Sequence, residues 1–202
     1  MSALVPIPAA RGDEVWRLFV GLRLNPETRA SLVRAQERLR RTGARVSWVK
    51  PENLHLTLAF LGDTFAARVP ALAAALDGAA GGVAPFDLGI AGLGAFGSPR
   101  SPRVIWAGAA AVPPGLTALH ERVSAALRAC GVPLEARPFA AHVTLGRVRA
   151  ARGAEALTSV LRSPMNPPPG GRLVVDRADL MRSELGPGGP VYTVLHESLL
   201  KE

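Results

Sequence analysis

The chain has 202 residues, of which 48% are hydrophobic, and its formal net charge is +8. This apolar content excludes a chain that is disordered throughout, and the length suffices for one sizeable domain or for two small lobes that share a core. The positive charge favours phosphate or nucleic-acid ligands, although a compositional bias toward arginine would produce the same charge.

Apolar residues that alternate with period two predict strands, and apolar residues three and four apart predict helices. Asn25-Pro26-Glu27 is typical of a helix start, and Gly62-Asp63-Thr64 is expected to open a second helix. In chain order we expect a strand at 17–24, a helix at 26–41, an extended segment at 45–50, a strand at 54–61, a helix at 67–78, strands at 86–90 and 103–109, a helix at 114–130, a strand at 139–148, a helix at 153–162, a proline-rich loop at 164–171, and strands at 172–184 and 190–199.

The single cysteine, Cys130, cannot form an intrachain disulfide, which is typical of a protein in a reducing compartment. Residues 1–10 have no basic start and contain two prolines, so they do not resemble a signal peptide. No apolar run is long enough to cross a bilayer. We therefore expect a cytoplasmic monomer that does not bind membranes.

A short pattern occurs twice, as His55-Leu56-Thr57-Leu58 and as His142-Val143-Thr144-Leu145. Residues two apart in a strand share a face and lie about 7 Å from each other. Each copy therefore presents a histidine and a threonine on one face and apolar side chains on the other. Two such copies predict two half-sites that meet across a cleft.

Strict alternation also assigns the residues that follow each motif. It places Ala59 on the face of the first histidine and Phe60 on the core face. In the second copy it places Gly146 on the face of the histidine and Arg147 on the opposite face. Arg147 would otherwise be a candidate phosphate ligand, and on this assignment we interpret it as structural.

The two halves of the chain have a similar predicted order of elements, and the motif histidines are 87 residues apart. This spacing suits a duplicated lobe better than a solenoid repeat. We predict an α+β fold, pseudo-symmetric and bilobal, in which two antiparallel sheets face a central cleft and helices pack outside. Residues 1–202 would form a single domain with approximate halves at 16–110 and 111–200, whose terminal strands could exchange between lobes.

Paired imidazoles suit phosphoryl chemistry. Because histidine titrates near pH 6.5, one imidazole can accept a proton from the nucleophile while the other donates one to the leaving oxygen. Threonine hydroxyls can donate hydrogen bonds to phosphoryl oxygens. This arrangement needs no metal and no cofactor. A single His-x-Thr on a strand is more often a buried core histidine, and His120 and His196 lack the threonine, so we interpret both as surface or packing residues.

Other chemistries have less support in the sequence. A catalytic zinc site takes three protein ligands, whereas the motifs supply two histidines with no acidic residue beside either. The sequence has no G-x-S-x-G nucleophile elbow, no P-loop and no dinucleotide-binding glycine pattern.

The motifs and their surroundings resemble the two-histidine phosphoesterases, and more narrowly the bacterial and archaeal RNA 2′,3′-cyclic phosphodiesterases, also called 2′-5′ RNA ligases. The resemblance extends from about residue 16 over almost the whole chain. One departure is Ala141, where the family usually has proline. The matching stretches are residues 17–20, 49–62, 102–106, 137–145 and 182–189.

The resemblance implies a bilobal α+β fold that hydrolyses RNA 2′,3′-cyclic phosphate ends to 2′-phosphomonoesters without a metal. By position, His55 and His142 are the acid/base pair, and Thr57 and Thr144 hold the phosphate. We assign His142 as the general base toward water and His55 as the acid toward the 3′ oxygen.

Two residues near the second motif are candidates for substrate contacts. Arg137 could bind phosphate and Phe139 could stack on a base, although packing would explain both equally well. Trp48 and Trp106 are expected in the core.

Three alternatives stay open. A 2′-5′ RNA ligase, or a phosphodiesterase for a small cyclic nucleotide such as an ADP-ribose cyclic phosphate, would use the same motifs. A binding module for RNA ends that has no catalytic activity is less consistent with the sequence, because a pure binder does not need a proton-transfer pair.

Overall fold

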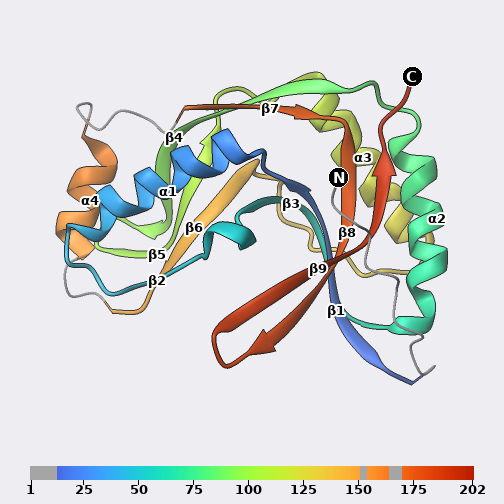
Figure 1. Cartoon of the computed structure of the whole chain (residues 1–202), viewed down its shortest axis with the longest axis horizontal. Helices are drawn as coiled ribbons and strands as arrows, with labels where there is room; N and C mark the ends of the chain where they lie inside the picture. Colours follow the sequence, from blue (N-terminus) through green and yellow to red (C-terminus); the bar gives the residue numbers. More distant parts are fainter. Residues whose placement is uncertain (1–12, 151–153, 164–169) are drawn as a thin grey trace.

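Figure 1 shows a computed structural model of the chain, which describes residues 13–150, 154–163 and 170–202. The segment 1–10, the first residue of the expected fourth helix and most of the expected loop at 164–171 lie outside these ranges. Within them, no helix has the length and hydropathy that are needed to cross a membrane.

The described residues form nine strands and four α-helices. The strands are β1 (Val15–Arg23), β2 (Val46–Trp48), β3 (His55–Phe65), β4 (Phe86–Ser98), β5 (Ser101–Ala109), β6 (His142–Val148), β7 (Gly171–Val175), β8 (Arg177–Gly186) and β9 (Gly189–Leu199). The helices are α1 (Pro26–Arg40), α2 (Val69–Ala80), α3 (Pro114–Ala129) and α4 (Ala154–Arg162), with 3-10 turns η1 (Pro51–Asn53) and η2 (Ala66–Arg68).

The strands pair antiparallel in the order β7-β4-β5-β6-β3-β1-β8-β9, and β2 lies beside β6. The predicted α+β class with antiparallel strands is confirmed. The two expected sheets join into one at the centre, where β3 meets β6 through a single residue pair, Leu56 and Val143. On one side of this join lie β1, β3, β8 and β9, and on the other lie β2, β4, β5, β6 and β7.

The sheet interleaves segments that are far apart in the sequence. Strands β4 and β5 pair on the side of β6, whereas β8 and β9, near the end of the chain, pair beside β1 (Figure 1). The single domain with halves at 16–110 and 111–200 stays a prediction about how the chain is organised.

The helices cover one face of the sheet. Helix α2 packs on β8 and β9, α3 on β3 and β4, α1 on β7, and α4 on β4 and β5. The central pair on this side, Leu56 and Val143, has no exposed surface (0% each). Since neighbouring side chains in a strand point to opposite faces, burying this pair turns the motif histidines to the other side. We call that side, which carries His55 and His142, the histidine face.

Strand β3 carries an extra residue at Leu58, where its register with β1 shifts. In such a bulge two consecutive residues oppose one residue of the partner strand, so the alternation of faces is interrupted. Leu58 and Ala59 are accordingly both buried, and Phe60 is 57% exposed. The prediction that placed Ala59 on the histidine face and Phe60 in the core is therefore wrong.

Strand β6 repeats this bulge at Leu145, where its register with β5 shifts. Leu145 and Gly146 are both buried and Arg147 is exposed. The prediction that grouped Gly146 with the histidine and Arg147 with the opposite face is wrong for the same reason. Arg147 lies on the histidine face.

Several element boundaries differ from the expected ones. Strand β3 continues to Phe65, past the expected helix start, and stays paired with β1 through a second register shift at Leu61, next to which Gly62 adopts a left-handed φ of +70°. The expected strand at 172–184 is two strands, which separate at Asp176 where the chain passes from one edge of the sheet to the other side. The second motif strand begins at His142 itself, not at residue 139.

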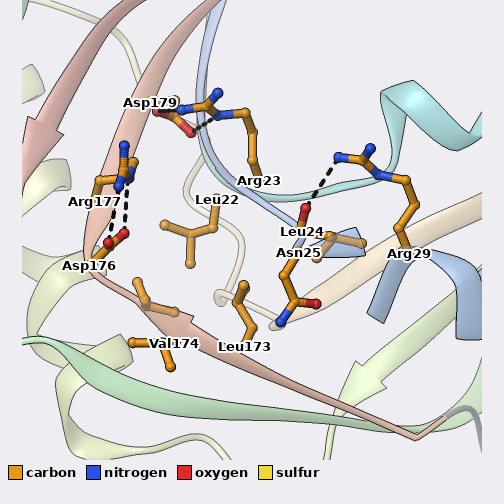
Figure 2. Close-up of a pocket in the computed structure, with 11 residues that line it drawn as sticks. Leu22, Arg23, Leu24, Asn25, Arg29, Leu173, Val174, Asp176, Arg177 and Asp179 are labelled. Atoms are coloured by element: carbon orange, nitrogen blue, oxygen red, sulfur yellow. Dashed lines mark hydrogen bonds and ion pairs between the residues drawn. The ribbon is translucent and has the colours of Figure 1, made fainter. Parts of the chain in front are cut away.

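A buried carboxylate connects three strands beside the motif of β3. Asp179 of β8 has no exposed surface (0%), and Arg23 of β1 donates to it from Nε at 2.8 Å and from Nη2 at 3.1 Å. Arg23 also pairs with Glu197 of β9. Burial raises the pKa of the Asp179 carboxyl, although Arg23 opposes this shift. Arg23 and Asp179 line a cavity of about 330 Å³ together with Leu22 and Leu173, and Figure 2 shows how these side chains lie.

Replacing Arg23 should destabilise the fold in a pH-dependent way. Arg23→Met keeps the apolar stem but leaves a buried carboxylate unpaired, which should lower the free energy of unfolding by about 3 kcal/mol at neutral pH. Because burial raises the folded-state pKa of Asp179, this loss should grow as pH rises through that pKa and should shrink in acid, where the carboxyl is protonated. Urea unfolding at several pH values measures it.

The matched control is Arg172→Met, whose ion pair with Asp87 is exposed on both sides. It should change the free energy of unfolding little at any pH. An equal loss in the two variants would contradict the role assigned to the Arg23–Asp179 pair.

Candidate active site

The two motifs meet at the centre of the sheet, on either side of the pair formed by Leu56 and Val143. Because β3 and β6 are antiparallel, the flanking residues lie beside each other on the histidine face, His55 next to Thr144 and Thr57 next to His142. The charge of His142 also acts to lower the pKa of His55, in keeping with this register. The structure thus brings all four motif side chains together.

The imidazole of His55 is oriented by two hydrogen bonds. Its Nδ1 lies 2.7 Å from the backbone oxygen of Asn53, and since a carbonyl only accepts, Nδ1 carries the proton. Its Nε2 lies 2.9 Å from Oγ1 of Thr57. Burial is the main cause that lowers the pKa of His55 below its usual value, and the bond to Asn53 opposes it. The neutral tautomer with a basic Nε2 is therefore favoured.

His142 is oriented in the same way but is less enclosed. Its Nδ1 lies 2.6 Å from the backbone oxygen of Ala140, again the residue two positions earlier. This contact forms although Ala141 replaces the proline that is usual in the resembling family. Both histidines therefore donate from Nδ1 to the chain and present Nε2 on the histidine face.

Aromatic rings enclose His55. The Phe19 ring lies 4.8 Å from the imidazole at 33°, and the Tyr192 ring meets it edge-on at 5.2 Å and 88°. Gly21, on the neighbouring strand, leaves room for the ring, because a Cβ there would lie 3.2 Å from Cδ2 of His55. These contacts come from β1 and β9, so the motif itself contains no signal for them.

His142 has an aromatic neighbour of its own. The Phe96 ring of β4 meets it edge-on at 4.9 Å, and Phe96 also contacts Trp106 at 5.6 Å. Trp106 lies directly opposite Thr144 in the β5–β6 register. Its ring covers Gly94, where a Cβ would lie only 2.2 Å from it. Trp106 is thus half-buried beside the site, whereas the sequence predicted a core position.

Arg147 is the site residue that strict alternation missed. The bulge at Leu145 places it on the histidine face, five positions after His142. The charge of Arg147 also acts on the opposite side of the site. Burial raises the pKa of Tyr192 overall, and the positive charges of Arg147 and Arg17 oppose this rise. A cation at this position can attract and hold a phosphate.

The two secondary candidates have other partners. Arg137 is 82% exposed at its side chain and pairs with Glu135 at 2.7 Å. Phe139 stacks on His120 of α3, with ring centroids 4.0 Å apart and planes at 13°. Neither contacts the motif histidines in the structure, and their role in substrate binding stays a prediction. The fourth histidine, His196, pairs with Asp77 of α2 at 2.8 Å.

The chain is similar to a known sequence family and to individual relatives within it. The family described as "LigT like Phosphoesterase" matches residues 22–106 and 108–192, one motif in each match. The RNA 2′,3′-cyclic phosphodiesterase of Methanothermobacter thermautotrophicus is 33% identical over 177 residues, which cover 88% of this chain and 95% of the relative. The protein of that name from Thermus thermophilus is 36% identical over 195 residues, covering 92% and 90%.

Solved structures show the same likeness. Escherichia coli LigT complexed with 3′-AMP has a TM-score of 0.76 at 29% identity, and the match covers 94% of this chain and 100% of that chain. A Thermus thermophilus crystal structure has a TM-score of 0.75 at 36% identity, covering 92% and 98%. The shared fold therefore includes both motifs.

Gly21→Ala should impair the site without unfolding the protein. The added Cβ would lie 3.2 Å from His55 and 3.1 Å from the backbone oxygen of Leu56, so the imidazole must move by a few tenths of an ångström. We expect turnover to fall about tenfold, because small misplacements of reacting groups are costly.

The control is Gly186→Ala, where a Cβ meets its nearest neighbour, the backbone oxygen of Gly189, at an ordinary 3.6 Å. Steady-state kinetics with a 2′,3′-cyclic nucleotide and thermal unfolding should be measured together. Unchanged turnover in Gly21→Ala would show that the His55 ring position is not constrained in the way described.

Proposed function

The chain belongs to the LigT-like phosphoesterases, and from this we propose that it is an RNA 2′,3′-cyclic phosphodiesterase that opens terminal cyclic phosphates to 2′-phosphomonoesters. The observation that carries the proposal is that each motif presents one histidine Nε2 and one threonine hydroxyl on the same face of the sheet. We further propose that the enzyme acts as a cytoplasmic monomer without a cofactor, and the single Cys130 is consistent with that compartment.

The surroundings of the two histidines suggest how they divide the work. Burial lowers the pKa of His55, so its neutral Nε2 is suited to accept a proton, which leaves the donor role to the other motif imidazole, His142. This assignment is the opposite of the one expected from the sequence, which made His142 the base.

The reaction then proceeds by in-line displacement. His55 Nε2 takes a proton from water as the water oxygen attacks phosphorus, the bond between phosphorus and O3′ breaks, and His142 Nε2 gives a proton to O3′. The products are a 2′-phosphomonoester and a 3′-hydroxyl. Thr57, whose hydroxyl donates to His55 Nε2 in the free enzyme, turns this single proton to a non-bridging oxygen when the phosphate binds and so frees Nε2 for the water. Thr144 donates to a non-bridging oxygen as well, and Arg147 offsets the charge of these oxygens.

Product analysis tests the choice of reaction. The enzyme should convert a cyclic-ended oligonucleotide and a 2′,3′-cyclic nucleotide to 2′-phosphates, identified by phosphorus NMR. A 2′-5′ RNA ligase would join ends with the same groups, using an RNA hydroxyl in place of water. Turnover of an ADP-ribose cyclic phosphate alone would instead indicate a small-molecule phosphodiesterase, and binding without turnover would indicate an RNA-end binding module.

Removing either motif histidine should abolish turnover. Because a positioned acid or base contributes about 10²–10⁴-fold, His55→Ala and His142→Ala should each lower kcat by about a thousandfold with little change in thermal unfolding. EDTA should have no effect. His196→Ala is the control and should keep full activity, since His196 pairs with Asp77 away from the motifs. Near-full activity in either motif variant, or loss in EDTA, would contradict the mechanism.

The pH profile should report the buried base. Since burial lowers the pKa of His55 below about 6.5 and the base must be neutral, kcat/KM should rise with pH through an apparent pKa under that value. Phe19→Ala exposes the ring, so this pKa should increase and the acidic limb should move to higher pH. An acidic limb that stays in place in Phe19→Ala would show that another group is the base.

A further inference from the structure

Beyond the catalytic groups, the histidine face of β1 and β3 continues as a row of paired side chains toward the far ends of the two strands. Strand β1 has no bulge, so distances along the row can be measured along this strand. At the usual rise per residue, the third pair of the row lies about 13 Å from the first pair, and the fifth pair lies about 26 Å from it. Starting at the site, the pairs are Arg23 with His55, Gly21 with Thr57, Phe19 with Phe60, Arg17 with Asp63, and Val15 with Phe65.

The exposed aromatic side chains of the described ranges all lie on this face. They are Phe60 (57% exposed), Phe65 (56%) and Phe96 (39%). Phe60 and Phe65 are placed there by the register of β3, and Phe96 by its contact with His142. Exposed apolar side chains that gather on one surface mark a binding site. Phe65 lies too far from His55 to take part in the reaction, so catalysis does not explain its exposure.

The positive charge of Arg17, which lies between Phe60 and Phe65 in the row, is available to a ligand. The side chain of Arg17 forms no ion pair or hydrogen bond with another residue that the structure describes, although Asp63 lies directly opposite it. Together with Arg147, it contributes positive charge beside Tyr192. Aromatic side chains that alternate with a free cation are what a single nucleic-acid strand requires, since bases stack on the rings and phosphates contact the cation.

We propose that this row binds the RNA strand that leads into the cyclic end, with bases stacked on Phe60 and Phe65 and a phosphate against Arg17. The proposal rests on the proposed function, because the row is continuous with the motif residues. Binding along the row makes a polynucleotide, and not a mononucleotide, the preferred substrate of the enzyme. The free arginine within the row favours RNA over an apolar protein segment as the occupant.

The test compares two substrates, a 2′,3′-cyclic mononucleotide and a cyclic-ended RNA of about eight nucleotides. In Phe65→Ala, kcat/KM for the oligonucleotide should fall about tenfold, the loss expected for one stacked base, and kcat/KM for the mononucleotide should not change. Phe65→Tyr should restore the oligonucleotide value because it keeps a ring. Val112→Ala, an exposed apolar residue between β5 and α3, is the matched control and should change neither.

The phosphate contact proposed for Arg17 is tested separately, by the salt dependence of oligonucleotide binding to the inactive His142→Ala variant. Adding Arg17→Gln should reduce the slope of log affinity against log salt by about one, the effect of losing one phosphate contact. An unchanged slope would overturn the assignment of Arg17.

The outcomes separate the two proposals. If the wild-type enzyme turns over neither substrate, the proposed function is wrong and the inference is lost with it. If it turns over both and Phe65→Ala lowers both equally, or lowers neither, the RNA row is wrong while the function stands. A change of sedimentation behaviour in Phe65→Ala with unaltered kinetics would identify the face as a protein interface and would also overturn the proposal.

Discussion

The site depends on one pairing in the middle of the sheet. Leu56 and Val143 are opposite each other and fully buried, and because side chains alternate along a strand, burying them turns both His-x-Thr pairs to the other face. A slip of one residue in either strand would move its histidine and threonine under the helices. The hydrophobic core therefore fixes the register, and the register fixes which groups can share one phosphate.

The two motifs are built by the same means and differ where their chemistry differs. Each has a leucine bulge after the threonine, and each histidine donates Nδ1 to a carbonyl two residues earlier. The fifth residue after the histidine then reaches the histidine face, and it is Phe60 in one copy and Arg147 in the other. The surroundings of His55 are thus more buried, with Phe19 and Tyr192 against the ring, whereas those of His142 are more open and include the cationic Arg147.

Short-range patterns in the sequence were enough to predict the strands, the helices and both motifs, because alternation, helix caps and turn residues are local. The bulges could not be predicted, since Leu58 and Leu145 are apolar and fit strict alternation equally well. Because each bulge shifts the alternation by one residue, Phe60 was assigned to the wrong face and Arg147 was not recognised as a site residue. Phe19 and Tyr192 were missed because strands distant in sequence bring them to His55. The charges around Asp179 were missed for the same reason, since β1, β8 and β9 meet only in the folded sheet.

The central claim is that both imidazoles act on one phosphate. It is tested most directly by nitrogen NMR of histidine-labelled protein during titration with a nucleoside 2′-monophosphate, the expected product. The account predicts that the Nε2 resonances of His55 and His142 shift together with one midpoint, while those of His120 and His196 stay in place. A shift confined to one motif histidine, or two different midpoints, would contradict it.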